Sequence, residues 1–425
     1  MTKFISSVLF ALVAIFPYLS TGQLRKGADA CLDKNIKTIQ LRKLNSEMTD
    51  PVIALGSSER LQLSFDDLAE DIRYFSYKIV LCNADWDESS LLFSDYLEGF
   101  PEGYISNREQ SFGTLVGYAR YTLEIPNSQM QVKLSGNYLI KVYDSDNPEA
   151  VLLQKSFSAV EPSAIGVQVS VRMLPLAGND ACTQQLELAV EHASFPISQP
   201  YTEVKVRVEQ NGYRFLNAAP PTPTFIRSSA IDYSHHNKNL YPGGSEYRHF
   251  DVSSIEYKMP RVQEISTINN VRCVQLEPDA AFKQYLYSPD INGRYVIRDE
   301  RYRSESDTRS DYPTVFLSLY MGQPLKGKVY VFGEISGWEL HNDFVMLYNN
   351  SRRAYELSMP VKQGYYNYKY IYVDENGVLD MRKIDACSSE TENIYGIYVY
   401  YRSPTDYHDK LLNVTWVSSQ GTRKN

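Results

Sequence analysis

The chain has 425 residues, of which 43% are hydrophobic, and a formal net charge of −8 at pH 7. The hydrophobic fraction is ordinary for a globular protein and excludes a chain that is disordered throughout. The acidic balance argues against a nucleic-acid partner, because the phosphates would be repelled. At about 150 residues per domain, this length predicts two to four domains.

Residues 1–22 have the pattern of a secretory signal peptide. Lys3 precedes an apolar run from Phe4 to Phe16, and the small residue Gly22 stands directly ahead of Gln23. We therefore expect cleavage after Gly22 and an exported chain, without a lipid anchor because Gln23, and not a cysteine, directly follows the cleavage point. No later apolar run approaches the roughly 18 to 20 residues of a membrane helix, so we expect no insertion into a membrane.

Period-two alternation recurs along the rest of the chain, whereas helical periodicity is nearly absent. In segments 167–171 and 204–208, valines alternate with polar residues, which is typical of half-buried antiparallel strands. Turn signals such as Asn211-Gly212 and Asn292-Gly293 separate these runs. The 34 tyrosines also favour strands. The sequence therefore predicts an all-β protein built from β-sandwiches.

Two breaks divide the exported chain into three predicted immunoglobulin-like sandwiches in tandem. The first break lies at Glu161-Pro162, after a strand-like segment. The second, 299–313, is charged, rich in serine and poor in large aliphatic residues, so we expect a linker or an exposed loop there. The predicted domains are 23–161, 162–311 and 312–425.

The cysteines are widely spaced and form no CxxC pair or Cys/His cluster, so we expect no metal site. They are Cys31, Cys82, Cys182, Cys273 and Cys387. An oxidising compartment permits disulfides, and the pairs Cys31–Cys82 and Cys182–Cys273 would stay within the predicted domains.

No catalytic motif stands out in the sequence. It contains no GxSxG elbow, phosphate-binding glycine loop or HExxH helix. Carboxylates such as Asp66, Asp67, Asp71, Asp85 and Asp87 have the chemistry of acid/base pairs, but no pair is singled out without a partner of shifted pKa. We therefore expect no enzyme and no cofactor, with a polysaccharide hydrolase as a minor alternative.

An aromatic stripe marks the last predicted domain. Four tyrosines occupy alternate positions of 364–372 and so stand on one face of a strand. With the Gly-Trp of 329–338, this pattern resembles early-set domains of the glycogen-binding type, in which residues at the positions of Trp338 and Lys369 help to hold an α-glucan. Those domains carry a second stacking tryptophan, whereas 374–380 has no aromatic residue. The alternatives are a carbohydrate-binding module of the cell envelope and tyrosines that simply fill a core or a seam between domains.

Several longer and distinctive sequence segments occur in the first two predicted domains. They are Leu63–Leu68, Asn83–Trp86, Tyr96–Phe100, Ile125–Asn127, Gln131–Ile140, Glu209–Gly212, Tyr241–Glu246 and Asp290–Tyr295. Together with the tyrosine-rich strand, they resemble the plug protein family of the type IX secretion system of Bacteroidetes, over essentially the whole exported chain.

The resemblance implies a periplasmic protein that docks under the large outer-membrane translocon barrel and closes its periplasmic mouth. A stopper of this kind needs a broad, rigid body and no chemistry, which tandem sandwiches can supply. Its contact with the barrel should be wet and polar with a few aromatic anchors, because it must leave when cargo arrives. We take Trp86 with the following Tyr96 and Phe100 as candidate partner-binding residues, with a core position as the alternative for the tryptophan.

Overall fold

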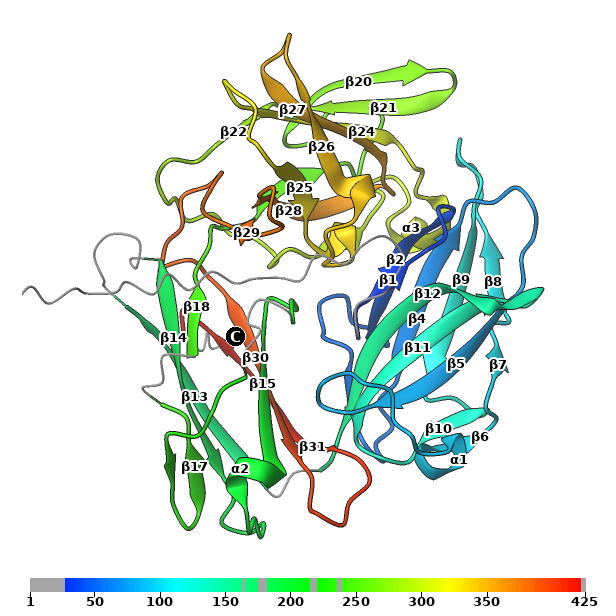
Figure 1. The fold of residues 1–425 in the computed structure, drawn as a ribbon. Helices are drawn as coiled ribbons and strands as arrows, with labels where there is room; N and C mark the ends of the chain where they lie inside the picture. The colour runs from blue at the N-terminus through cyan, green and yellow to red at the C-terminus, as the bar shows by residue number, and fades with distance from the viewer. Residues whose placement is uncertain (1–26, 163–164, 175–181, 215–219, 235–238, 422–425) are drawn as a thin grey trace, which may run out of the picture.

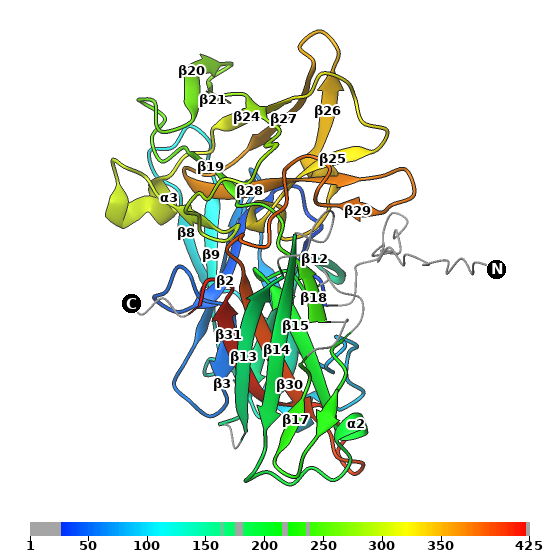
Figure 2. The same cartoon turned by 90° about the vertical axis from the view of Figure 1, so that its left-hand side faces the viewer.

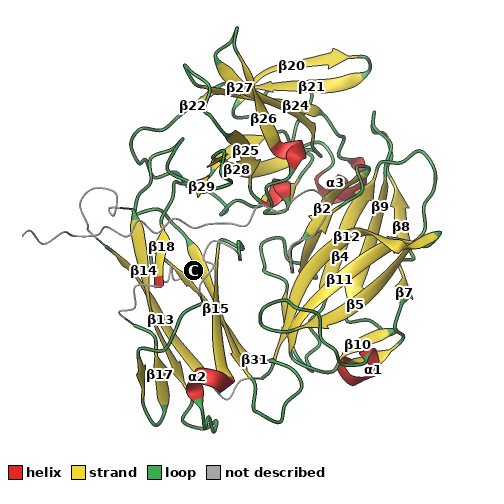
Figure 3. Cartoon of the chain, in the orientation of Figure 1, coloured by secondary structure: helices red, strands yellow, loops and turns green. Residues whose placement is uncertain are grey.

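The computed structural model describes residues 27–162, 165–174, 182–214, 220–234 and 239–421 (Figure 1). The predicted signal peptide lies outside this part of the chain. Within the described ranges every helix is about one turn long, and strands carry the fold (Figure 3), so the predicted all-β class is confirmed. The helices are α1 (Phe93–Tyr96), α2 (Pro200–Glu203), α3 (Ser306–Arg309), η3 (Arg303–Glu305), η4 (Glu334–Ser336) and η5 (Asn342–Phe344).

The first sandwich packs two antiparallel-rich sheets face to face. One has the order β1-β12-β11-β5-β7, with β3 beside β12; the other has the order β2-β4-β9-β8, and a β10–β6 ladder lies at one end. The strands are β1 (Ala30–Cys31), β2 (Ile36–Lys43), β3 (Val52–Ala54), β4 (Leu61–Asp67), β5 (Phe75–Cys82), β6 (Leu97–Gly99), β7 (Gly103–Tyr104), β8 (Asn107–Gln110), β9 (Ala119–Ile125), β10 (Met130–Val132), β11 (Gly136–Asp144) and β12 (Asn147–Val160).

Alternation explains how these strands form a core. On β5, Phe75 and Tyr77 point inward, and the Phe75 ring meets Phe65 and Tyr121 edge to face, with ring centroids 5.2 Å and 4.8 Å apart. The intervening residue Ser76 therefore lies on the outer face of the sheet.

The second sandwich joins segments that are far apart in the sequence. One sheet has the order β13-β14-β17-β16, with β18 beside β14, and the other is β15-β30-β31. The last two strands of the chain thus complete this sandwich (Figure 2), and their side chains share its core with those of β14 and β15. The strands are β13 (Gly166–Met173), β14 (Thr183–Glu191), β15 (Val204–Gln210), β16 (Phe225–Ile226), β17 (Ala230–Asp232), β18 (Leu240–Pro242), β30 (Ile394–Tyr401) and β31 (Lys410–Ser418).

The third unit, residues 245–390, is an 11-stranded sheet that folds over one core. Its main path is β19-β28-β25-β26-β27-β24-β21-β20, with β22 beside β24 and with β23 and β29 beside β28. The strands are β19 (Arg248–Asp251), β20 (Val262–Ile268), β21 (Val271–Leu276), β22 (Asp279–Ala280), β23 (Tyr295–Ile297), β24 (Thr314–Tyr320), β25 (Lys328–Phe332), β26 (Val345–Asn349), β27 (Ala354–Pro360), β28 (Gly364–Val373) and β29 (Leu379–Asp380).

This pairing differs from the predicted boundaries at 161/162 and, above all, at 311/312. Strands β19 to β23 fall in the predicted middle domain 162–311 but pair within the third unit, whereas β30 and β31 fall in 312–425 but pair with β15. The third unit is therefore inserted into the second sandwich rather than following it. Local patterns show where strands form, whereas pairing depends on partners distant in the chain.

The predicted linker 299–313 is exposed over much of its length, as expected of a loop, but its end packs against the first sandwich. It contains η3 and α3, and its end is buried: Ser310, Asp311 and Tyr312 are at most 6% exposed. The Asp311 carboxylate accepts hydrogen bonds from the backbone N–H groups of Leu115 and Val116 in the first sandwich. The charge and serine content that suggested a linker serve here in contacts between two units.

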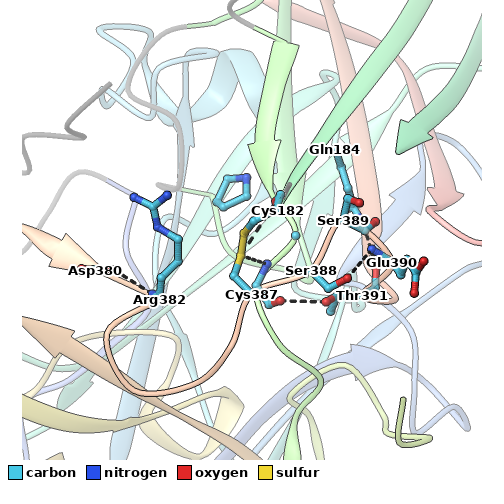
Figure 4. Close-up of a disulfide and its surroundings, with 12 residues drawn as sticks. Cys182, Gln184, Asp380, Arg382, Cys387, Ser388, Ser389, Glu390 and Thr391 are labelled. Atoms are coloured by element: carbon cyan, nitrogen blue, oxygen red, sulfur yellow. Dashed lines mark hydrogen bonds between the residues drawn. A yellow bond between two sulfur atoms is a disulfide. The ribbon is translucent and has the colours of Figure 1, made fainter. Parts of the chain in front are cut away.

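The disulfide differs from both predicted pairings. Cys182 bonds to Cys387 (Figure 4), while Cys31, Cys82 and Cys273 are free thiols. Cys182 lies just before β14, and Cys387 lies in the segment that returns from the third unit to β30. The wrong domain boundary hid this pair, because it assigned the two residues to different domains.

Candidate functional site

The three candidate partner-binding residues lie in different environments. Trp86 is half-buried under the second sandwich, with the Arg214 guanidinium 4.2 Å from its ring centre. Tyr96 is a core residue, 7% exposed. Phe100 is 62% exposed. Of these three, only Phe100 offers an accessible aromatic surface.

Phe100 belongs to a group of large apolar side chains on the outer edge of the first sandwich. We call this group the outer-edge patch: Ile72, Tyr74, Leu92, Phe93, Phe100 and Tyr104, which are between 39% and 71% exposed. They lie at the start of β5, around α1 and β6, and on β7. In Figure 1, α1, β6 and β7 lie on the side of the first sandwich that faces away from the other two units, whereas β5 runs across the sheet.

Local geometry holds the patch in place. The Phe100 backbone N–H donates to the Gln129 carbonyl oxygen at the β10–β6 ladder. Gly99 precedes it with φ of 112°, and a Cβ built there would lie 1.9 Å from the same oxygen, so only glycine fits. The backbone N–H of Leu92, just before α1, donates to the Asp95 carboxylate. Sequence analysis missed Ile72, Tyr74 and Tyr104, since apolar residues on the two faces of a strand look alike in the sequence.

The two candidate carbohydrate-binding residues, Trp338 and Lys369, also lie in different environments. Lys369 is 5% exposed, and its ammonium lies 3.9 Å from the ring centre of Tyr247. Burial lowers the pKa of this lysine to about 8, against the opposing effect of Asp290 and Glu246. Trp338 is half-buried and packs against Phe332, with ring centroids 5.9 Å apart. A buried ammonium cannot reach a sugar held on the surface.

The tyrosine stripe of β28 is core. Tyr366, Tyr368, Tyr370 and Tyr372 all belong to the core of the third unit. The hydroxyls of Tyr368 and Tyr370 both donate to the Asp279 carboxylate, at 2.6 Å each. The same carboxylate accepts from Arg248 at 3.0 Å. A single buried acid thus satisfies the polar tips of two core tyrosines and a buried arginine.

Asp66, one of the carboxylates that resembled acid/base candidates, joins two units together. Asp66 and Lys362 are both fully buried, and the Lys362 ammonium lies 2.5 Å from the Asp66 carboxylate. Tyr312 donates to the same carboxylate at 2.6 Å, and Arg120 lies 3.3 Å away. Since Asp66 comes from the first sandwich and Lys362 from the third unit, this cluster fastens one to the other.

A second set of ion pairs also joins the first sandwich to the third unit. The Arg42 guanidinium pairs with Glu334 at 2.8 Å and donates to the Tyr295 carbonyl oxygen at 2.8 Å. Arg294 pairs with Asp50 at 2.5 Å. These groups line a small polar cavity of about 60 Å³ where all three units meet.

The second sandwich is fastened to the first by similar contacts. Asp85 pairs with Arg207 of β15, and the Asp409 carboxylate accepts the Ala84 backbone N–H at 2.8 Å. The Arg214 guanidinium over Trp86 also pairs with Glu209 at 2.7 Å. An apolar seam supports these contacts and contains Val52, Ala84, Tyr398, Tyr400 and Leu411.

The larger cavity, about 160 Å³, lies beside β19 in the third unit. Arg248 lines it and is already paired with Asp385 at 2.7 Å, with its guanidinium 3.8 Å from the ring centre of Phe282. Over the described ranges, no group of three His, Cys, Asp or Glu residues is placed to hold a metal ion. The described helices include none long and apolar enough to cross a membrane.

Comparison with known proteins identifies relatives of this chain. The family model described as the first domain of the type 9 secretion system plug protein matches residues 36–161, within the first sandwich. A crystal structure of a hypothetical protein from Parabacteroides merdae ATCC 43184 is similar with a TM-score of 0.89 and 34% sequence identity, covering 93% of this chain and 100% of that chain. A comparison with curated proteins found no match.

Proposed function

Because the chain belongs to the type 9 secretion system plug protein family and so has a role in type IX secretion, we propose that it is a non-enzymatic periplasmic plug. It docks on the outer-membrane translocon barrel and seals the periplasmic opening until cargo passes. The outer-edge patch is the docking surface.

The observation that carries this proposal is the exposed outer-edge patch on three units that are held together by ion pairs. Large apolar and aromatic side chains exposed along one side of a domain are typical of surfaces that bind other proteins. The patch contains three aromatic side chains exposed by more than 60%: Tyr74, Phe100 and Tyr104. It lies away from the contacts between units, so docking leaves those contacts undisturbed.

Rigidity supports the role of a stopper. The Asp66–Lys362 pair and the Arg42–Glu334 pair hold the third unit on the first sandwich. Asp85–Arg207 holds the second sandwich on the first. A body fastened in this way can cover a wide opening without a change of shape.

The disulfide supports an extracytoplasmic location. Bonds such as Cys182–Cys387 persist in oxidising compartments, of which the bacterial periplasm is one. The buried ammonium of Lys369 leaves the carbohydrate-binding alternative without one of its two candidate residues, so we do not favour it.

The test is capture of the barrel by the full exported chain. A tagged chain should recover a large barrel from detergent-solubilised outer membrane, and its deletion should make the outer membrane permeable to solutes that are normally excluded. The Phe100→Ala, Tyr104→Ala variant should recover much less barrel. A matched control, Tyr320→Ala with Leu347→Ala, removes exposed apolar side chains from the third unit and should bind as the native chain does. Equal recovery by both variants would exclude the outer-edge patch as the docking surface.

A further inference from the structure

The outer face of the sheet beside the outer-edge patch carries a row of tyrosines. Tyr104 of β7 and Tyr143 of β11 both lie opposite Ser76 of β5. Residues directly opposite in a sheet share a face, so the order Tyr104, Ser76, Tyr143 runs across three strands. Tyr74 and Lys78 are the neighbours of Ser76 on the same face of β5. We call the five residues Tyr74, Ser76, Lys78, Tyr104 and Tyr143 the tyrosine row.

Two members of the tyrosine row are open to solvent, and one has unused hydrogen-bonding capacity. Tyr74 and Tyr104 are each 68% exposed. Ser76 is 1% exposed, and its hydroxyl has no hydrogen-bond partner in the structure.

The face around the row is acidic. Burial, and after it the carboxylates of Glu88, Glu102 and Glu149, raise the pKa of Tyr143. The loop that carries Asp146 is tied to Tyr74, because the Ser145 backbone N–H donates to the Tyr74 carbonyl oxygen. Asp146 and Glu149 are both exposed.

The protein itself already places a cation on this face. The Lys78 ammonium lies 5.1 Å from the ring centre of Tyr143 and 3.5 Å from the Glu102 carboxylate. Lys141 pairs with Glu88 at 2.5 Å. Lys78 pairs with Glu102 and Lys141 pairs with Glu88, whereas Asp146 and Glu149 form no ion pair with any of the residues that the structure describes.

We propose that the tyrosine row binds a basic segment of the partner protein, whose lysine or arginine side chains lie on the rings of Tyr74 and Tyr104 and reach the carboxylates of Asp146 and Glu149. This inference rests on the proposed plug function and adds the chemistry of the partner. Charge complementarity selects the occupant, because an acidic aromatic face attracts cations and repels acidic segments. The long stems of lysine and arginine can cover the tyrosine rings while their charged ends stay at the rim.

The experiment measures binding of the full exported chain to detergent-solubilised outer membrane from cells that lack it. Asp146→Lys with Glu149→Lys should weaken binding about tenfold, mainly through slower association, and should reduce the loss of binding between about 50 and about 500 mM salt. The matched control, Glu264→Lys with Glu375→Lys, reverses exposed acids of the third unit and should bind as the native chain does.

A second pair of variants tests the aromatic ring of Tyr104 separately from the carboxylates of Asp146 and Glu149. Tyr104→Phe keeps an aromatic face and should bind within about twofold of the native chain, whereas Tyr104→Leu should lose about tenfold. Thermal unfolding of each variant checks that the sandwich is intact.

The outcomes separate this inference from the proposed function. Native binding by the Asp146→Lys, Glu149→Lys variant, together with weak binding by Phe100→Ala, Tyr104→Ala, overturns the basic partner and leaves the plug. Tighter binding by the charge-reversal variant also overturns it. Failure of the native chain to recover any barrel overturns the plug function itself.

Discussion

The ammonium of Lys362 lies 2.5 Å from the carboxylate of Asp66, and neither side chain is exposed to solvent. The two residues are 296 positions apart in the chain. A buried pair of this kind pays a large desolvation cost, so its main effect is to fix how its two elements meet. Here it fixes the third unit on the first sandwich.

Breaking this pair should destabilise the protein strongly. Lys362→Met leaves the Asp66 carboxylate buried beside Tyr312 and Arg120, and we expect a loss of about 3 to 5 kcal/mol in the free energy of unfolding. Urea denaturation measures it. The exposed pair Arg60–Glu124 is the control, because Arg60→Ala should have a much smaller effect on the free energy of unfolding. Similar losses for the two variants would contradict a structural role for the buried pair.

Stability should depend on pH through Lys369. Burial lowers its pKa to about 8 from an ordinary 10.5. Between these values the unfolded chain binds more protons than the folded one, so this lysine makes stability rise as pH rises from about 8 toward 10.5. Below pH 8 it is charged in both states, and the full cost of burying the charge remains.

The Lys369→Met variant removes this contribution. The difference in unfolding free energy between it and the native chain should be largest below pH 8, with the variant favoured, and should shrink as the pH is raised. Lys383→Met, at an exposed site, is the control and should show no such trend. A difference that stays constant from pH 7 to pH 10 would contradict the buried, shifted lysine.

Loss of the disulfide should lower stability. Cys182 and Cys387 close a loop of 205 residues, and we expect Cys387→Ser to cost about 2 to 5 kcal/mol in the free energy of unfolding. Thermal unfolding with and without reductant measures it, and peptide mapping of the oxidised chain should recover the two cysteines in one cross-linked fragment. Cys273→Ser is the control, and reductant should affect it as it affects the native chain. A native chain insensitive to reductant would argue against the bond.

The outer-edge patch should depend on Gly99. Gly99→Ala puts a Cβ against the Gln129 carbonyl oxygen at a φ of 112°, so we expect a loss of about 1 to 3 kcal/mol and weaker docking, as Phe100 shifts. Gly56→Ala is the matched control. Gly56 also has a positive φ, of 74°, but its Cβ would meet nothing within 4 Å, so it should cost about 1 kcal/mol and leave docking unchanged.

Much of the local structure could be predicted from the sequence. The valine alternation at 167–171 and 204–208 falls within β13 and β15, and the four tyrosines of 364–372 share one face of β28. Each prediction depends only on the two-residue period of a strand, which the sequence displays directly. The family resemblance could also be recognised from the sequence, because it depends on sequence segments that follow one another in order along the chain.

The candidate site was only partly predictable. Phe100 is exposed, but Tyr96 is in the core and Trp86 lies beneath Arg214. An aromatic residue at the end of a strand has the same sequence context whether it packs inward or faces solvent. Its exposure depends on what the rest of the chain places over it.

The sequence by itself determined that this protein is all-β, where several of its strands run and which family it belongs to. Only the tertiary structure decided that β30 and β31 return to β15, that Cys182 meets Cys387 and that the end of 299–313 packs between units. Strand formation follows from neighbouring residues, whereas pairing, burial of charge and exposure of aromatic rings depend on residues that only the folded chain brings together.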